Sequence, residues 1–146
     1  MLSGEYAHSL DDKGRITIPV KFRKELGNSF MITNGLDGCL FIFPDKEWKI
    51  FETQLRTQGV LSNKDVRTLT RYFVGGGVSS ILDKTGRTII PSSLRDNAGL
   101  DKEIVLVGVL NRIEIWDKDK WNNQTKNIRD NADEIANHLD ELGINL

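Results

Sequence analysis

The chain has 146 residues, 38% of them hydrophobic and 28% charged, and its formal net charge is −1. These values are typical of a soluble globular protein, and no apolar run approaches the roughly 20 residues that a membrane-spanning helix requires. No basic segment followed by an apolar stretch opens the chain, and the single cysteine, Cys39, cannot form an internal disulfide. We therefore expect a protein of the reducing cytoplasm, with Cys39 as a small core residue.

The first part of the chain, residues 1–58, predicts a small β-unit followed by a helix. Alternating polar and apolar residues, interrupted by Gly, Pro, Asn and Asp, indicate strands at residues 4–10, 15–18, 30–32 and 40–43. We expect the first two strands to pair as a hairpin through the turn at 11–14, and a short helical turn at 22–26 to follow. Large apolar residues spaced by three and four predict an amphipathic helix at 45–57.

Residues 59–77 predict a linking helix and a glycine-rich joint. Ser62 and Asp65 resemble a capping box at the start of that helix, with the acid shorter than usual. The three glycines at 75–77 break the helical pattern, and no Gly-Lys-Ser or Gly-Lys-Thr of a phosphate-binding loop follows them. We therefore expect a flexible joint or a place of tight backbone packing.

The rest of the chain repeats this order and ends in another helix. Strands are expected at residues 78–82, 87–90, 103–108 and 112–116, with a helical turn at 92–98. The segment 122–146 predicts an amphipathic helix at 124–142, and its apolar residues share one face: Ile128, Ala132, Ile135, Ala136, Leu139 and Leu142. That face requires a partner, which is either the core of the same chain or another subunit.

The first turn and the strand after it return later in the chain. Residues 11–19, DDKGRITIP, match residues 83–91, DKTGRTIIP, at an offset of 72, and Trp48 matches Trp121 at an offset of 73. A repeat of this length predicts two copies of one structural unit. Because each copy spans only about 40 to 45 residues, we expect the copies to fuse into one body, to oligomerise, or both.

No set of residues suited to catalysis or metal binding emerges from the sequence. His8 and His138 lie far apart, and neither has metal-ligand spacing to a cysteine or another histidine. Nucleophile-elbow, Walker and dinucleotide-binding motifs are absent from the sequence. We therefore expect a protein that is not an enzyme and that uses no metal, cofactor or small-molecule substrate.

The strongest local signal is an Asp-x-x-x-Arg motif at the same point of both copies, Asp11 with Arg15 and Asp83 with Arg87. One interpretation is an ion pair that pins the turn. In the other, the aspartate orients the guanidinium, and the arginine contacts phosphates or guanine edges. Residues 11–24 carry five cations against two anions, whereas residues 117–146 carry four cations against seven anions.

Taken together, these segments resemble the MraZ family of bacterial regulators, within the AbrB-like group of swapped-hairpin DNA-binding proteins. The resemblance covers nearly the whole chain and rests on residues 4–6, 10–19, 35–40 and 82–91. It implies an α+β fold in which two swapped-hairpin units, at 1–58 and 78–121, form a pseudo-symmetric β-barrel with flanking helices. It also implies a ring, an octamer, that binds direct repeats of double-stranded DNA at the nucleoid. Such a ring would regulate the division and cell-wall gene cluster.

The resemblance also assigns residues to the DNA. The expected DNA-binding set is Arg15, Arg87, Lys13, Lys84, Lys21, Arg23 and Lys24. The expected structural members of the motifs are Asp11, Gly14, Asp83 and Gly86, since glycine lets the backbone approach a ligand closely. Thr85 replaces Lys13 in the second copy and a serine replaces Lys21, so we expect unequal use of the two motifs.

Two other functions fit the same pattern. One is an antitoxin-like autorepressor of the same fold, and the other is a ring-forming adaptor that binds a protein through its acidic tail. RNA also stays open as the nucleic acid, although no run of aromatic residues suited to stacking unpaired bases is present in the sequence.

Overall fold

A computed structural model describes residues 1–145. In this range the strands are β1 (Leu2–Ser9), β2 (Arg15–Thr17), β3 (Ser29–Asn34), β4 (Leu40–Pro44), β5 (Val78–Ile81), β6 (Arg87–Ile89), β7 (Glu103–Leu110) and β8 (Ile113–Asp117). The helices are α1 (Val20–Leu26), α2 (Asp45–Thr57), α3 (Lys64–Thr70), α4 (Ser92–Asn97) and α5 (Lys118–Leu139). A π-helical turn, η1 (Arg71–Gly75), follows α3, and a 3-10 turn, η2 (Asp140–Leu142), follows α5.

The strands of the two repeats exchange partners. Six strands form an antiparallel sheet in the order β1-β7-β8-β4-β3-β5, and β2 pairs with β6 in a separate two-stranded ribbon. Strand β1 therefore pairs with the second repeat, with Leu2 opposite Leu110, and β5 pairs with the first, with Val78 opposite Ile32. Each turn is still closed locally, because the amide of Asp11 donates to the carbonyl of Arg15 at 3.0 Å. The expected ladder between the first two strands is thus wrong, since β1 pairs with β7 and β2 pairs with β6, both of the other repeat.

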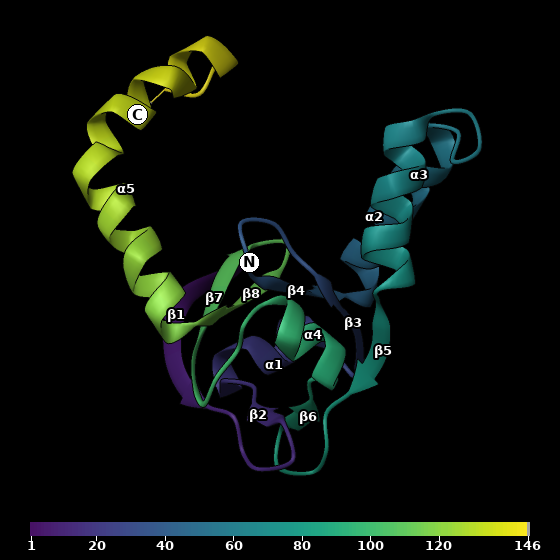
Figure 1. Ribbon diagram of the computed structural model, residues 1–146, viewed down its shortest axis with the longest axis vertical. Helices are drawn as coiled ribbons and strands as arrows, with labels where there is room; N and C mark the ends of the chain where they lie inside the picture. The colour runs from purple at the N-terminus through teal and green to yellow at the C-terminus, as the bar shows by residue number, and fades with distance from the viewer. Residues whose placement is uncertain (146) are drawn as a thin grey trace.

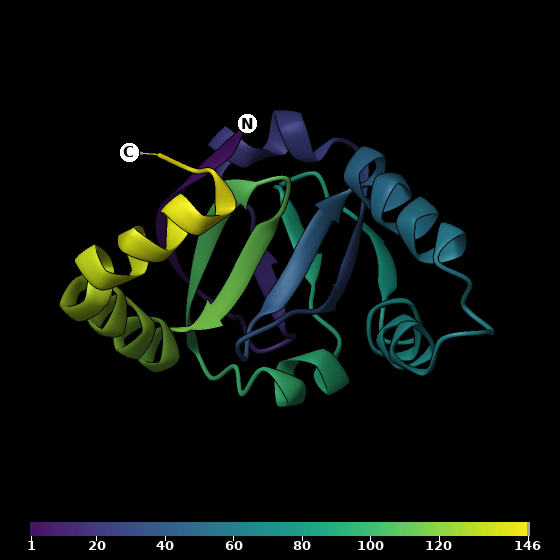
Figure 2. The ribbon, with the colours of Figure 1, turned by 90° about the horizontal axis from the view of Figure 1, so that it is seen from above.

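The expected closed barrel is also not formed by hydrogen bonding. The outer strands of the large sheet are β1 and β5, and no ladder joins them within residues 1–145. The ribbon β2–β6 lies at one end of the body (Figure 1), and α1 and α4 lie on opposite sides of the body (Figure 2). The fold is therefore an α+β arrangement of a six-stranded sheet, a two-stranded ribbon and helices.

The large sheet separates two clusters of buried side chains. The inner cluster contains aliphatic residues from both repeats and phenylalanines from the first, among them Ile16, Phe22, Ile90 and Leu94. The other cluster is richer in aromatic residues from β4, α2, η1 and β8, which include Phe41, Phe43, Trp48, Phe73 and Trp116. Because both repeats contribute to both clusters, the two halves form one folded body.

Two helical arms project from the body on the side away from the ribbon (Figures 1 and 2). One arm contains α2 and α3, and the other is α5. The last helix begins at Lys118 rather than at residue 124, because Trp121 in its first turns packs against Trp116 with ring centroids 5.5 Å apart. None of its residues is buried, and Ile128 and Ile135 are each 44% exposed. The interpretation that its apolar face packs into the core of the same chain is therefore wrong.

The joint between the repeats is tightly packed. Asn63 caps α3 by accepting from the amides of Asp65 and Val66 at 2.9 and 3.1 Å, so the cap lies one residue after the expected Ser62. A Cβ built on Gly76 would lie 2.6 Å from the carbonyl oxygen of Tyr72 and would also meet the amide of Asn34. Of the two interpretations of the three glycines, tight backbone packing is confirmed at Gly76.

None of the helices in the described part of the chain is long and apolar enough to cross a membrane.

Candidate nucleic-acid interface

In the first turn, the side chain of Asp11 organises the backbone. One carboxylate oxygen accepts from the amides of Lys13 and Arg15, both at 2.9 Å, and the other accepts from Arg15 Nε at 2.6 Å. Gly14 has a positive φ of 76°, a conformation that glycine adopts without the strain of a side chain. The Asp-x-x-x-Arg spacing therefore produces a closed turn in which the aspartate fixes both the backbone and the guanidinium.

In the second repeat, the same geometry surrounds Asp83. Its carboxylate accepts from the amides of Thr85 and Arg87 at 2.9 Å and from Arg87 Nε at 3.0 Å. The hydroxyl of Thr85 adds a further bond at 2.9 Å, which the lysine at the equivalent place in the first turn does not supply. Gly86 takes a φ of 80°, so the two turns share one backbone conformation.

These hydrogen bonds lower the pKa of both carboxyl groups. The amide of Arg87 is the largest cause of the shift at Asp83, and it brings that pKa to about 2, with the amide and hydroxyl of Thr85 contributing. The pKa of Asp11 is also lowered, and the hydrogen bond from the amide of Arg15 is the largest cause. Both aspartates are therefore ionised at neutral pH and hold the neighbouring arginines through charge-assisted hydrogen bonds.

The arginines keep part of their hydrogen-bonding capacity free. Arg15 and Arg87 have side chains 26% and 36% exposed. Among the hydrogen bonds of residues 1–145, only the Nε of each guanidinium group is engaged, in both cases by the aspartate. The terminal Nη groups are left to meet a ligand, and a guanidinium held at Nε presents them in a fixed plane. The ion pair and the ligand contact are therefore compatible rather than exclusive.

The ribbon brings the two motifs to the same end of the molecule. Arg15 lies opposite Ile89, and Thr17 lies opposite Arg87, in the β2–β6 ladder. Both turns project together below the ribbon (Figure 1). Both arginines line one open hollow of about 450 Å³, together with Val78, Ser80, Ile81, Asp83, Thr88, Ile89 and Pro91.

The other expected residues fall into two groups. Lys13 and Lys84 are exposed in the turns, and Lys21 and Lys24 are exposed on α1. Arg23, in contrast, is half-buried, and its Nε donates to the carbonyl of Ile18 at 2.8 Å. The four lysines are thus free to add positive charge beside the motif arginines, whereas Arg23 is directed into the protein.

Arg95, on α4, was missed by sequence reasoning. It lies over Gly14 of the first turn, as Arg23 lies over Gly86 of the second turn. The signal was present, since Arg23 and Arg95 occupy equivalent positions of the repeat at the same offset of 72. The close approach that the two glycines permit is therefore made by arginines of the opposite repeat.

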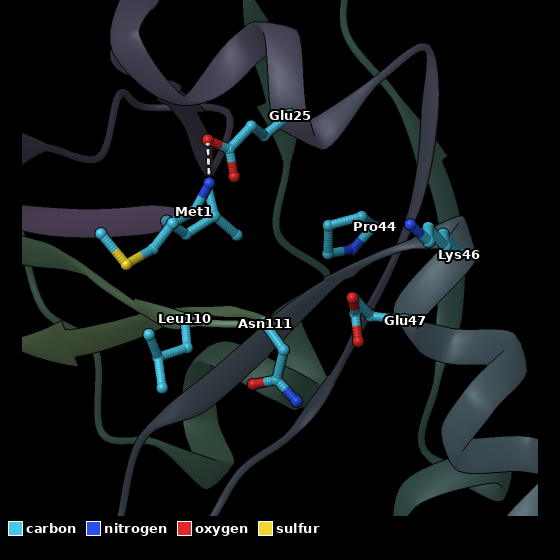
Figure 3. Close-up of a pocket in the computed structure, with 8 residues that line it drawn as sticks. Met1, Glu25, Pro44, Lys46, Glu47, Leu110 and Asn111 are labelled. Carbon is cyan, nitrogen blue, oxygen red and sulfur yellow. Dashed lines mark hydrogen bonds and ion pairs between the residues drawn. The ribbon is translucent and has the colours of Figure 1, made fainter.

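A second hollow, of about 400 Å³, lies at the other end of β1 from the first turn (Figure 3). Its lining includes Met1, Glu25, Pro44, Glu47 and Leu110. The terminal ammonium group of Met1 is paired with Glu25 at 2.5 Å. No group of three or more His, Cys, Asp or Glu residues that could hold a metal ion occurs in the described range. The hollow therefore contains no constellation comparable with the paired turns.

Comparison with known proteins gives a consistent result. A model of the MraZ family, described as "MraZ protein, putative antitoxin-like", matches the chain twice, at residues 1–72 and 73–141. The chain is 51% identical over 144 residues to a protein of Lachnoclostridium phytofermentans called "Transcriptional regulator MraZ", covering 99% of both chains. It is 49% identical to the protein of that name from Clostridium beijerinckii and 47% identical to that from Thermoanaerobacter pseudethanolicus, in each case over 99% of this chain and 100% of the relative.

Proposed function

The chain belongs to the MraZ family of transcriptional regulators, a family that is not enzymatic, and we propose that it acts by binding double-stranded DNA through its two basic turns. The observation that carries this proposal is the pair of turns at one end of the molecule, each presenting an arginine held at Nε by an aspartate. The target that we propose is a set of direct repeats upstream of the division and cell-wall genes, and the site of action is the cytoplasm at the nucleoid.

The geometry of the turns suits both parts of DNA recognition. An arginine with free Nη groups can form paired hydrogen bonds with the O6 and N7 atoms of guanine, or with a phosphate. Lys13 and Lys84 in the same turns, and Lys21 and Lys24 on α1, add charges that favour phosphate contacts. The motif arginines would therefore supply specificity, and the exposed lysines would supply attraction that depends on salt.

A single chain offers few of these contacts, so we propose that the functional form is a ring of identical chains, an octamer. The charges of the two arms favour such an assembly: residues 45–71 carry six cations and four anions, whereas residues 117–146 carry four cations and seven anions. Apolar side chains are exposed on both arms, Ile50 and Leu69 on one and Ile128 and Ile135 on the other. A contact between unlike arms of neighbouring chains is head-to-tail, and contacts of that kind form a ring when the rotation between neighbouring chains closes.

A ring would also account for binding to repeated DNA sites. Several turns held together raise the effective concentration of each at its site, so weak individual contacts add up to tight binding. Rotationally repeated turns can follow direct repeats when the DNA bends, and the cost of bending adds sequence preference.

The test is binding of the purified protein to DNA from upstream of its own gene, with a shuffled DNA of the same length and composition as the control. We expect a complex on the upstream DNA that forms at lower protein concentration than any complex on the shuffled DNA. Equal binding to the two DNAs, or binding to neither at low salt, would contradict the proposal.

The assembly is tested separately, by light scattering of Ile128→Gln combined with Ile135→Gln. Because both side chains are exposed in the single chain, we expect the variant to fold but to have a lower molar mass in solution than the wild-type assembly. Asn137→Gln, an exposed change on the opposite face of α5, is the matched control and should leave the mass unaltered. An unchanged mass in the double variant would exclude α5 as a subunit contact.

The description of the family as antitoxin-like favours one second candidate, an autorepressor that also neutralises a small toxin. A toxin-binding segment of that kind would be the exposed face of α5. The antitoxin function requires that the protein copurifies with a second small protein in a fixed ratio. An adaptor function would instead require a protein partner bound without any DNA.

A further inference from the structure

Each basic turn is covered by an arginine from the opposite repeat. Arg95 belongs to α4 of the second repeat, yet a Cβ built on Gly14 of the first turn would overlap its guanidinium, with Cζ 2.6 Å away. The reciprocal contact joins Arg23 of α1 to Gly86, where a Cβ would lie 2.5 Å from Arg23 Nε. The two contacts are related by the same exchange that pairs the strands of the two repeats.

The backbone hydrogen bonds follow the same crossed pattern. The amide of Ile90 donates to the carbonyl of Gly14 at 2.9 Å, and the amide of Ile18 donates to the carbonyl of Gly86 at 2.8 Å. Arg23 Nε donates to the carbonyl of Ile18, so one arginine links the end of its own strand β2 to the turn of the other repeat. Each turn is therefore held from one side by its own aspartate and from the other side by residues of the opposite repeat.

We propose that Arg95 and Arg23 are positioning residues exchanged between the repeats: Arg95 sets the turn that presents Arg15, and Arg23 sets the turn that presents Arg87. The inference rests on the proposed function for its consequence in DNA binding, but the crossed support is a property of the folded chain alone. A planar guanidinium can lie flat against a residue that has no side chain, whereas the ammonium group of lysine cannot reproduce that surface.

The exchange also changes the charge of the turns. Residues 11–15 carry two anions and two cations, so the first turn becomes net positive only when Arg95 is counted with it. Residues 83–87 carry one anion and two cations, to which Arg23 adds a third positive charge. The second turn has fewer basic neighbours in its own repeat than the first turn has, and the positive charge of Arg23 from the first repeat makes up for this shortage.

The first experiment is amide hydrogen exchange of Arg95→Ala and Arg23→Ala without DNA. In Arg95→Ala we expect faster exchange of the amides of Lys13, Gly14 and Arg15, with the amides at 85–87 unchanged. The reverse pattern is expected in Arg23→Ala. Faster exchange in the turn of the same repeat, in both turns equally, or in neither turn would overturn the proposal. If an alanine variant does not fold, Arg95→Lys and Arg23→Lys give the same test, because lysine keeps the charge but not the planar contact.

The second experiment is a double-mutant cycle in DNA binding. Removal of an arginine that reads a specific base weakens binding by about tenfold. We expect Arg15→Ala and Arg95→Ala together to weaken binding little more than Arg15→Ala alone, because both changes disable one turn. Arg15→Ala with Arg23→Ala disables both turns, and its effects should multiply to about a hundredfold. Equal coupling in the two pairs would overturn the crossed arrangement.

The two experiments separate the two claims. If each arginine variant speeds hydrogen exchange in the turn of the opposite repeat, but the protein does not bind the upstream DNA, the positioning of the turns is upheld and the proposed function is contradicted. If the protein binds the upstream DNA specifically, but the variants do not speed hydrogen exchange in the turn of the opposite repeat, the function is upheld and the positioning is contradicted.

Discussion

Replacing Gly76 by alanine tests how the second repeat and its preceding arm are joined to the sheet. Gly76 directly follows η1, and Asn34 at the end of β3 donates from Nδ2 to the carbonyl of Tyr72 in that turn at 3.0 Å. A Cβ on Gly76 would meet both partners of this hydrogen bond, and it would lie 2.6 Å from the Tyr72 oxygen. The joint therefore has no room for a methyl group.

The size of the effect follows from which atoms must move. The side chain of Asn34 could turn away, but the Tyr72 oxygen belongs to the backbone and can shift only with η1. Overpacking of a tight site costs about 1–3 kcal/mol, and breaking the hydrogen bond costs about 1 kcal/mol. Alanine recovers about 0.4–1 kcal/mol by restricting the unfolded chain. We expect Gly76→Ala to lower the free energy of unfolding by about 2 kcal/mol, which corresponds to a fall in Tm of roughly 6 °C.

The neighbouring glycine supplies the control. Outside its own helical turn, a Cβ built on Gly75 meets no atom within 4 Å, and the φ of Gly75 is not positive, so Gly75→Ala should be neutral or stabilising. Urea denaturation of both variants at one protein concentration measures the difference. Equal stability of the two variants would refute the reasoning, because it would mean that the joint is loose at both positions.

Three further changes test other parts of the structure. Thr33→Val removes a buried hydroxyl that donates to the carbonyl of Phe73 at 2.5 Å, and we expect a loss of about 1–3 kcal/mol in urea denaturation; the exposed Thr68→Val should cost less than about 0.5 kcal/mol. Asp83→Asn removes a carboxylate with a pKa of about 2, below the usual 3.8. Its stabilisation is complete above about pH 4 and disappears as pH falls towards 2, so the difference in Tm from the wild type should shrink across that window and not at higher pH. Burial raises the pKa of the Cys39 thiol to about 12, so we expect no reaction with a thiol reagent at about pH 8 until denaturant is added; rapid reaction of the folded protein would contradict that burial.

The sequence was sufficient to predict most elements but not their partners. Alternation of polar and apolar residues locates a strand and its buried face, so the strands near residues 30–32 and 40–43 were expected close to where they lie. Alternation carries no information about which strand lies alongside. Two similar repeats offer a strand similar partners in either copy; β1, β2, β5 and β6 use partners in the other repeat, whereas β3–β4 and β7–β8 also pair within one repeat.

The same limit applies to the candidate site. The Asp-x-x-x-Arg spacing predicted the two turns because their geometry is local, fixed by a carboxylate and amides two and four residues away. The repeat pairs Arg95 with Arg23, but the contact of Arg95 with Gly14 spans the two repeats, and no local pattern encodes that contact. The exposed face of α5 was ambiguous for a similar reason, since an apolar stripe predicts a partner without identifying it.

The most direct test of the account is the salt dependence of binding to the upstream DNA for Arg15→Ala, Arg87→Ala and Arg56→Ala. Arg56 is a matched control, because it forms the same kind of ion pair four residues away, with Glu52 at 3.1 Å, but on α2 and far from the turns in the fold. We predict that each motif variant weakens specific binding by about 1–3 kcal/mol and reduces the salt slope by about 1 for each phosphate that the arginine neutralises. Arg56→Ala, compared at an oligomeric mass that light scattering shows to equal that of the wild type, binds as the wild type does. If all three variants bind the upstream DNA as tightly as the wild type does, the central claim is contradicted and the paired turns have a structural role alone.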